Sequence, residues 1–346
     1  MHEFNKPFIV TLCEKTVPYK ISRSFWIPCS AKFISLCSNP SNDGKVQIFE
    51  IQKGQIEQFH EESMKKSFNC GTLKASSVKN RHLATGDCSG NLNIWDLQHS
   101  FEPVYAVQAH RELIHSIDGV AGDCAGCGAP EIVTGSRDGY VKVWDPRQKD
   151  KPVAIMESVD DVKRECWSVA FGNSYNSQER VVCAGFDNGD IKMFDLRNMS
   201  LRWETNLPNG ICSLEFDRQT IKMNKLLATC LEGGVSVFET RNREEDIPCV
   251  SKKIDNSTVW CGKHLPQNRE IFTTCHGSGS IHLWKYNYCD EITGERKGSI
   301  EELRQSHVGE QGINSFDWSS DKIGLAVCSS FDQVIRLLYI TQLNIQ

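Results

Sequence analysis

The sequence predicts an all-β chain in which residues 1–346 form a single seven-bladed β-propeller. Three observations predict this fold. A short apolar strand, a polar turn with glycine, an alternating apolar strand and an acidic residue recur seven times. The copies lie 44 to 54 residues apart and fill the chain, a period typical of four-stranded propeller blades. An extra apolar segment, residues 7–13, precedes the first copy, whereas the last copy ends without an outer strand.

Each copy predicts the same local structure. In residues 132–144 the turn Arg137-Asp138-Gly139 separates two strands, and Gly139 supplies the positive φ that such a hairpin needs. One position, followed by Asp in the clearest copies, is held by a large apolar side chain: Phe49, Trp95, Trp144, Phe194, Phe238, Trp284 and Leu338. The Trp-Asp ending is the mark of a WD repeat. Because one blade cannot bury both of its faces, neighbouring blades must stack.

The segment at residues 7–13 is predicted to complete the last blade. We expect it to pair with residues 333–340 and to close the ring between the two ends of the chain. Closure removes sheet edges that would otherwise promote aggregation.

Composition narrows the class of partner. The formal net charge is −5 and no run of Lys or Arg exceeds two residues, so we expect neither nucleic-acid nor membrane binding. The first 20 residues contain no apolar stretch of signal-peptide length, which favours a protein of the reducing cytosol or nucleus. Its 16 cysteines are then predicted to be free thiols, and several recur in one strand of successive copies.

No arrangement of residues predicts catalysis, a cofactor or a metal. The chain lacks a phosphate-binding loop and a nucleophile elbow, and turn residues Asp138 and Asp332 are expected to accept turn hydrogen bonds. Cys124 and Cys127 form one C-x-x-C in the Gly-rich connection of residues 119–130. Together with His110 they could hold zinc, but a structural site needs four ligands and the alternative is a flexible loop.

The strands predicted to line the channel share one position near its mouth. That position is held by Ser22, Asn69, His115, Trp167, Cys212, Trp260 and Asn314. Tryptophan is favoured at interface hot spots, so the sequence predicts a partner-binding rim. Its proposed residues are Trp167, Trp260, His115, Arg137, Arg111 and Phe331, with Arg164 and Asp187 nearby. The alternative is that the two tryptophans only pack between blades.

Three copies place an arginine two residues after the acidic position: Arg147, Arg197 and Arg241. These arginines could pair with carboxylates on the blade surface, where an ion pair adds little stability. Trp-Asp-x-Arg boxes also resemble those of propellers that recruit substrates to cullin-type ubiquitin ligases, and a guanidinium fork suits a partner carboxylate.

Several stretches carry a closer resemblance: residues 28–33, 129–150, 179–199, 201–206, 209–218, 264–270 and 328–336. In these stretches, which span nearly the whole chain, the sequence resembles the Monad family of WD-repeat dynein axonemal assembly factors. The resemblance implies a monomeric cytoplasmic propeller that works with a prefoldin-like co-chaperone assembly in preassembling the dynein arms of motile cilia. The implied partners are a co-chaperone adaptor with tetratricopeptide repeats, RuvB-like ATPases, prefoldin-like subunits and axonemal dynein chains.

The chain departs from the general blade pattern in its histidines. Only His110 clearly occupies the position before a channel strand, where it could join Thr134, Asp138 and Trp144 in a buried hydrogen-bonded set. The sixth copy has Asp255 there, which puts the internal bonding of that blade in doubt.

Three functions remain open: a non-enzymatic scaffold or adaptor for dynein assembly, a ubiquitin-ligase substrate receptor, and a zinc enzyme using His110, Cys124 and Cys127.

Overall fold

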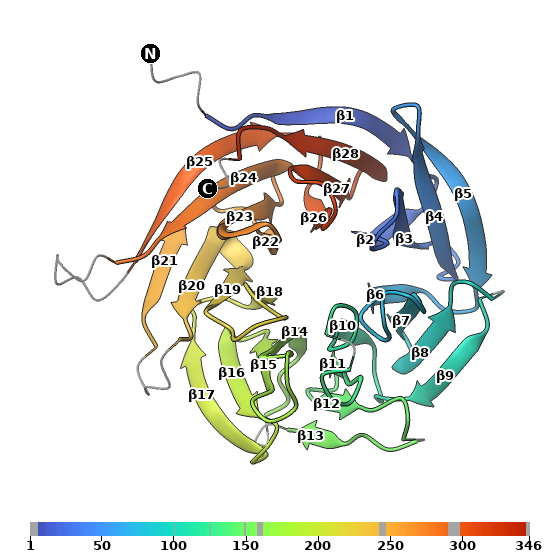
Figure 1. Cartoon of the computed structure of the whole chain (residues 1–346), viewed down its shortest axis with the longest axis vertical. Coiled ribbons are helices and arrows are strands. Elements are labelled where there is room, and N and C mark those ends of the chain that lie inside the picture. The colour runs from blue at the N-terminus through green and yellow to red at the C-terminus, as the bar shows by residue number, and fades with distance from the viewer. Residues whose placement is uncertain are drawn as a thin grey trace.

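The strands form a ring around a central channel (Figure 1). The computed structural model describes residues 6–99, 101–124, 126–148, 150–157, 162–241, 247–289 and 298–343. Within these residues the chain forms seven four-stranded sheets, and consecutive strands of each sheet pair in antiparallel fashion. The predicted seven-bladed propeller is confirmed.

Each blade runs from an inner strand at the channel to an outer strand at the rim of the ring (Figure 1). Blades 1 and 2 consist of β2 (Lys20–Trp26), β3 (Lys32–Ser38), β4 (Gly44–Gln52) and β5 (Gln55–Met64), then β6 (Phe68–Thr72), β7 (His82–Asp87), β8 (Asn91–Asp96) and β9 (Pro103–Gln108). Blades 3 and 4 consist of β10 (Ile114–Gly119), β11 (Ile132–Ser136), β12 (Val141–Trp144) and β13 (Ala154–Met156), then β14 (Cys166–Gly172), β15 (Val181–Phe186), β16 (Asp190–Asp195) and β17 (Ser200–Asn206).

The remaining blades follow the same order, except that the last one takes its outer strand from the start of the chain. Blades 5 and 6 consist of β18 (Ile211–Phe216), β19 (Lys225–Cys230), β20 (Gly234–Glu239) and β21 (Cys249–Lys253), then β22 (Val259–Leu265), β23 (Asn268–His276), β24 (Ser280–Asn287) and β25 (Ser299–His307). A 3-10 turn, η2 (Leu231–Gly233), joins β19 to β20. Blade 7 consists of β26 (Ile313–Trp318), β27 (Leu325–Ser330), β28 (Val334–Ile340) and β1 (Ile9–Thr16).

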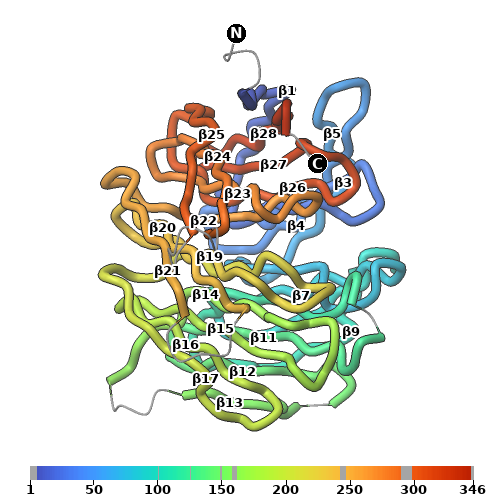
Figure 2. Tube along the Cα trace, turned by 60° about the vertical axis from the view of Figure 1, so that its left-hand side comes forward, coloured from blue at the N-terminus to red at the C-terminus, as the bar shows by residue number. Residues whose placement is uncertain are grey.

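Pairing of the first and last strands closes the ring. Strand β1 lies antiparallel to β28, with Ile9 opposite Ile340 and Thr16 opposite Val334. The two strands lie side by side in both views of the chain (Figures 1 and 2). The predicted closure is confirmed, although the strand extends three residues beyond the expected end at residue 13.

The middle strands of the blades supply the core. All six residues of β15 and all six of β19 are buried, because these strands are covered on both faces by neighbouring blades. The cysteines expected in this strand are there and are free and buried: Cys37, Cys183, Cys230, Cys275 and Cys328. Burial raises the pKa of the Cys37 thiol to about 12, so it acts as a small apolar side chain.

Side chains in the channel join neighbouring inner strands at four of the seven junctions between blades. Serine hydroxyls accept a backbone N–H from the following blade in three places: Ser315 from Ser24 at 2.9 Å, Ser116 from Val169 at 3.2 Å, and Ser168 from Leu214 at 2.8 Å. Carboxylates deeper in the channel do the same: Asp317 accepts from Trp26 at 2.9 Å, Asp118 from Phe171 at 3.0 Å, and Glu215 from His264 at 2.6 Å. The inner strands therefore form a cross-linked collar that fixes the channel mouth.

Blade 3 contains the buried set that the sequence predicts. His110 Nδ1 lies 3.0 Å from Asp138, His110 Nε2 lies 2.8 Å from Thr134 Oγ1, and Trp144 Nε1 donates to the same Oγ1 at 3.0 Å. Burial raises the pKa of Asp138, but the hydrogen bond and charge of His110 outweigh it and lower that pKa to about 2. Asp138 also accepts the turn hydrogen bond from the Tyr140 N–H, as expected. Gly139 has φ +88°.

Blade 6 has a similar set in which the histidine and the aspartate have exchanged places. Asp255 lies before the inner strand, and His276 lies at the end of the second strand. Trp284 Nε1 donates to Thr274 Oγ1 at 2.9 Å, and His276 Nε2 lies 3.0 Å from that oxygen. His276 occupies the strand-end position held by Ser136 in blade 3, and its Nδ1 lies 3.7 Å from the Asp255 carboxylate. The bonds to the threonine hydroxyl, which the sequence left in doubt, are therefore present in blade 6, whereas His276 Nδ1 has no hydrogen-bond partner among the described residues. A histidine from the second strand takes the place of the one missing before the first.

His276 is expected to make the stability of the ring depend on pH. Burial lowers the pKa of His276 from 6.5 to about 4, with a further lowering from His282. The unfolded chain then binds more protons than the folded one between about pH 6.5 and pH 4, so stability falls as the pH falls through this window. We expect the unfolding free energy to drop by about 2 kcal/mol between pH 7 and pH 5 from this residue alone.

Urea unfolding at pH 7 and pH 5 measures this effect. His276→Gln should lose that part of the pH dependence, whereas His99→Gln should keep it because the His99 side chain is 81% exposed. Equal pH slopes in His276→Gln and the unmodified protein would contradict the prediction.

Candidate functional site

The seven positions predicted to surround the channel mouth share one backbone feature. Each lies at a β-bulge near the start of its inner strand, where the pairing with the second strand shifts register: Ser22, Asn69, His115, Trp167, Cys212, Trp260 and Asn314. A bulge leaves its extra residue outside the ladder and re-aims its side chain. The seven side chains therefore form a ring at the face of the propeller that also carries the turns between second and third strands. We call this face the top face.

Part of this ring bridges neighbouring blades. Ser22 Oγ donates to the Phe68 carbonyl at 2.9 Å, Asn69 Nδ2 donates to the His115 carbonyl at 3.4 Å, and Asn314 Nδ2 donates to the Ile21 carbonyl at 2.7 Å. Each of these bonds crosses from one blade to the next. On blades 7, 1 and 2 the ring position therefore contributes to cohesion of the propeller.

A second part of the ring gathers around a carboxylate that the sequence did not single out. Glu165 Oε2 accepts from Trp167 Nε1 at 3.1 Å and lies 3.2 Å from His115 Nε2, while Glu165 Oε1 accepts from Arg137 Nε at 3.0 Å. Three of the predicted rim residues, from blades 3 and 4, thus converge on one side chain. We call Glu165, His115, Arg137 and Trp167 the Glu165 cluster.

Electrostatics keep the Glu165 cluster ordered near neutral pH. Burial lowers the pKa of His115, and hydrogen bonding to Glu165 offsets this only in part. Burial raises the pKa of Glu165, but its bonds to Trp167 and His115 outweigh that effect and lower the pKa. A neutral imidazole therefore donates its Nε2 proton to an ionised carboxylate.

Trp167 also packs against the next blade. A Cβ at Gly210 would lie 2.7 Å from the Trp167 ring, so the glycine makes room for the indole. Trp167 therefore packs between blades, as the alternative interpretation held, and it also bonds Glu165. Arg137 is 54% exposed and Arg111 is exposed, with only its backbone N–H held by Asp138 at 3.0 Å. Blade 3 thus exposes two guanidinium groups on this face, one of which is bonded to Glu165.

The other predicted rim residues meet on blades 6 and 7. Trp260 and Phe331 make an edge-to-face pair with ring centroids 5.3 Å apart and planes at 78°. Phe331 is 38% exposed and Trp260 is half-buried. Five of the six predicted rim residues therefore fall into two groups, the Glu165 cluster and the Trp260–Phe331 pair, and Arg111 lies in neither.

The three arginines of the Trp-Asp-x-Arg-like boxes have different surroundings. Arg147 pairs with Asp145 at 2.7 Å, and its side chain stays 64% exposed. The Arg197 backbone N–H donates to Asp195 at 2.9 Å, as that of Arg147 does to Asp145 at 3.0 Å. Arg241 instead lies over the Tyr288 ring at 4.3 Å and donates to Asn224. The Arg147 side chain thus pairs with a carboxylate as expected, but that carboxylate is buried rather than on the blade surface, and Arg241 has an amide and an aromatic ring as partners.

The connection that contains Cys124 and Cys127 is anchored to three other blades. Gly122 donates to the Ser76 carbonyl at 2.8 Å, Cys124 Sγ donates to the Gln219 carbonyl at 3.3 Å, and Arg180 donates to the Cys127 carbonyl at 3.1 Å. Across the residues that the structure describes, no three His, Cys, Asp or Glu side chains are grouped to hold a metal ion. The geometry therefore does not favour the zinc hypothesis with His110, whose ring nitrogens face Asp138 and Thr134.

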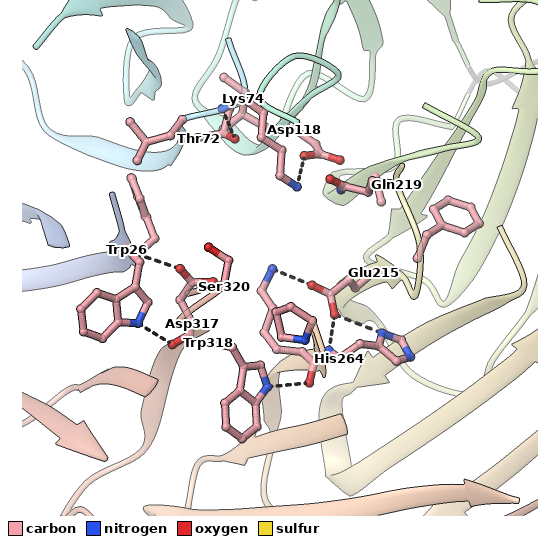
Figure 3. Close-up of a pocket in the computed structure, with 18 of the residues that line it drawn as sticks. Trp26, Thr72, Lys74, Asp118, Glu215, Gln219, His264, Asp317, Trp318 and Ser320 are labelled. Carbon is pink, nitrogen blue, oxygen red and sulfur yellow. Dashed lines mark hydrogen bonds and ion pairs between the residues drawn. The ribbon is translucent and has the colours of Figure 1, made fainter. Parts of the chain in front are cut away.

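The channel opens at the opposite, bottom face into a cavity of about 420 Å³ that the sequence did not predict (Figure 3). Lys74 lies 3.3 Å from Asp118 and Lys263 lies 2.9 Å from Glu215. Burial raises the pKa of Asp317 to about 6. The sequence does contain a signal for these charges. In four of the seven copies, the residue three positions after the bulge residue is charged: Asp118, Glu215, Lys263 and Asp317. These charges mostly compensate one another and bind adjacent blades.

The part of the chain that the structure describes contains no helix long and apolar enough to cross a membrane. Residues 101–145, which include most of blade 3, match the family described as WD domain, G-beta repeat.

Full-length relatives extend this similarity. The chain is 53% identical to dynein axonemal assembly factor 10 of Bos taurus, over 99% of each chain. It is 53% identical to the protein of that name from Homo sapiens, over 99% of each chain, and 45% identical to that from Chlamydomonas reinhardtii, over 98% of each. The predicted family resemblance is thereby confirmed. With this identity over nearly its whole length, the chain belongs to the family of dynein axonemal assembly factor 10.

Proposed function

We propose that this protein is a non-enzymatic scaffold that binds other proteins during the assembly of axonemal dynein. The observation that carries the proposal is the near full-length similarity to proteins named as dynein axonemal assembly factors. The fold supports it, because a rigid closed ring presents loop-built surfaces without a reaction centre of its own.

The partners follow from the family resemblance. We expect a co-chaperone adaptor with tetratricopeptide repeats, RuvB-like ATPases, prefoldin-like subunits and axonemal dynein chains, bound by a monomeric ring in the cytoplasm. The top face is the proposed binding surface, because its bulges hold aromatic and charged side chains at fixed positions around the channel mouth.

Replacing the rim tryptophans is expected to weaken partner capture without unfolding the ring. Trp167→Ala should remove the indole that Glu165 and Gly210 position, and Trp260→Ala should remove half of the exposed aromatic pair. Because such anchors dominate interface energies, each change should lower capture of a partner about tenfold or more. Affinity capture from the cytoplasm of ciliated cells, followed by mass spectrometry, measures the recovery of RuvB-like ATPases and dynein heavy chains.

A matched control is Phe59→Ala on outer strand β5, where the ring is 58% exposed and far along its blade from the channel. It should leave capture unchanged, and circular dichroism should show that all variants stay folded. Undiminished capture by the folded Trp167→Ala, Trp260→Ala double variant would remove the rim from the proposal.

A second candidate is a substrate receptor of a cullin-type ubiquitin ligase. The observation that favours it is the equal turn geometry of Arg147 and Arg197 on adjacent blades. The same capture experiment tests it: a ligase adaptor should be recovered with the unmodified chain and lost with the Arg147→Ala, Arg197→Ala variant. Recovery of no adaptor by the unmodified chain rejects this candidate.

A further inference from the structure

The charges on the top face are divided between two sectors. Six turns form the top of blades 5 to 7: residues 207–210, 231–233, 254–258, 276–279, 308–312 and 331–333. They carry four carboxylates and neither lysine nor arginine: Glu232, Asp255, Glu310 and Asp332. The turns of blades 3 and 4 instead carry Arg111, Arg137, Lys163 and Arg164 beside their acidic residues. The Trp260–Phe331 pair lies in the acidic sector.

Not all four carboxylates remain free to act on a ligand. Asp332 pairs with the buried Arg336 at 2.9 Å. Asp255 accepts from Ser257 and is 37% exposed; burial raises its pKa, but the bonds from Ser257 outweigh that effect and keep it ionised. Glu232 and Glu310 are exposed. Glu232 also accepts from Asn209 at 3.4 Å. The sector that contains the aromatic pair therefore keeps a net negative charge.

The Trp260 indole is left open by its neighbours. A Cβ at Gly277 would lie 3.6 Å from Trp260 Nε1, and a Cβ at Gly312 would lie 2.9 Å from the Gly277 backbone, so neither position places a side chain over the ring edge. Six of the other seven indoles donate their N–H within the described part of the protein, the exception being Trp203 on outer strand β17: Trp26, Trp95, Trp144, Trp167, Trp284 and Trp318. Among the described residues the Trp260 N–H has no acceptor, so it is available to a ligand.

We propose that the Trp260–Phe331 pair receives an arginine side chain of a protein partner. A guanidinium group stacks on aromatic faces, is weakly hydrated and can be flanked by carboxylates, which is what this sector supplies. The free indole N–H suits a backbone carbonyl of the same partner segment. This inference rests on the proposed function and adds the chemistry of the partner at one of its two rim groups.

The experiment uses the full chain with ¹⁵N-labelled tryptophan and follows the indole N–H signals by NMR. The signal of Trp260 is the one that disappears in Trp260→Phe. The probes are N-acetyl-arginine amide and its neutral isostere N-acetyl-citrulline amide. Arginine is expected to shift the Trp260 signal saturably, with at least fivefold weaker binding for citrulline, while the Trp167 signal stays in place because Glu165 holds its N–H.

Two variants test the origin of the binding. Phe331→Ala should weaken arginine binding about fivefold or more, because it removes one of the two rings. Glu232→Gln with Glu310→Gln should weaken arginine binding about threefold or more and leave citrulline binding unchanged. Equal binding of arginine and citrulline would overturn the inference.

The outcome is distinguishable from the fate of the proposed function. If Trp260→Ala lowers partner capture but arginine leaves the Trp260 signal unmoved, the rim binds partners and this inference is wrong. If arginine shifts the signal but Trp260→Ala captures partners normally, the arginine site stands and the proposed use of this rim group fails.

Discussion

A chain that lacks its first 16 residues is expected to lose the closed ring and to aggregate. In the intact protein, strand β1 (Ile9–Thr16) pairs with β28 over seven residues and covers what would otherwise be an unpaired edge of blade 7. Each lost backbone hydrogen bond costs about 1 kcal/mol, so the direct loss is on the order of 5 kcal/mol. An exposed edge also offers a template for pairing with another chain.

The cost also includes a buried charge. Arg336 is 4% exposed and donates to Glu14 on β1 at 2.9 Å as well as to Asp332. Removal of β1 exposes this guanidinium and takes away one of its two carboxylates. Lys15 of β1, which donates to the Ile56 carbonyl of blade 1 at 3.1 Å, also disappears, so blades 7 and 1 lose a direct contact.

Size-exclusion chromatography and thermal unfolding measure the effect. The shortened chain should elute as aggregates, and a synthetic peptide of residues 6–16, added during refolding, should restore monomer. Glu14→Ala should cost no more than about 1 kcal/mol, because the Glu14 side chain is half exposed and Asp332 still neutralises Arg336. A shortened chain that stays monomeric and melts at the normal temperature would show that β1 does not hold the ring closed.

The repeating features of the ring could be predicted from the sequence because seven copies report on one structure. The alignment of the copies placed His115, Trp167 and Trp260 at one position, and that position proves to be the bulge of every inner strand. Comparison of the copies also shows that the last one lacks an outer strand, and this assigns residues 7–13 to it. A single blade considered alone does not reveal the missing strand. The repeat period and the strand register are common to all seven copies, so a position that is ambiguous in one copy can be assigned from the others.

Features that belong to one blade could not be predicted in this way. Glu165 precedes a strand and has no counterpart with the same role, so only the three-dimensional approach of His115, Arg137 and Trp167 reveals it. In blade 6 the missing histidine leaves the internal bonding in doubt, because the sequence pattern cannot show that His276 reaches the equivalent hydroxyl from another strand.

The contacts of the Gly-rich connection with Cys124 could not be predicted for a related reason. Its composition predicts flexibility or a metal, but its partners come from other blades: Ser76, Arg180 and Gln219. Long-range contacts of a unique loop leave no periodic trace in the sequence.

The buried hydroxyls of Thr134 and Thr274 are expected to stabilise their blades by several kcal/mol, because each bonds both a tryptophan N–H and a histidine ring nitrogen. Thr134 Oγ1 accepts from Trp144 Nε1 and bonds His110 Nε2, and Thr274 Oγ1 does the same for Trp284 and His276. Replacement by valine keeps the shape and leaves two buried polar groups without a partner. At about 1–3 kcal/mol for each such group, Thr134→Val and Thr274→Val should each cost about 2–6 kcal/mol.

Two matched variants separate hydrogen bonding from packing. Thr85 is fully buried and accepts from the single donor Trp95 Nε1 at 2.8 Å, so Thr85→Val should cost about 1–3 kcal/mol, roughly half as much. Thr229 is fully buried, and its hydroxyl has no hydrogen-bond partner among the described residues. Thr229→Val should therefore be neutral or stabilising, because it removes a polar group that burial already penalises.

Urea unfolding midpoints of the four variants, measured at pH 7, give the comparison. Thr274→Val is the informative member, because its cost reports whether the network rebuilt around His276 is worth as much as the one around His110. A cost equal to that of Thr85→Val would mean that only the Trp284 bond contributes in blade 6. A cost equal to that of Thr134→Val would mean that exchanging the histidine between strands preserves the full stabilisation, since the hydroxyl then satisfies two buried partners in both blades.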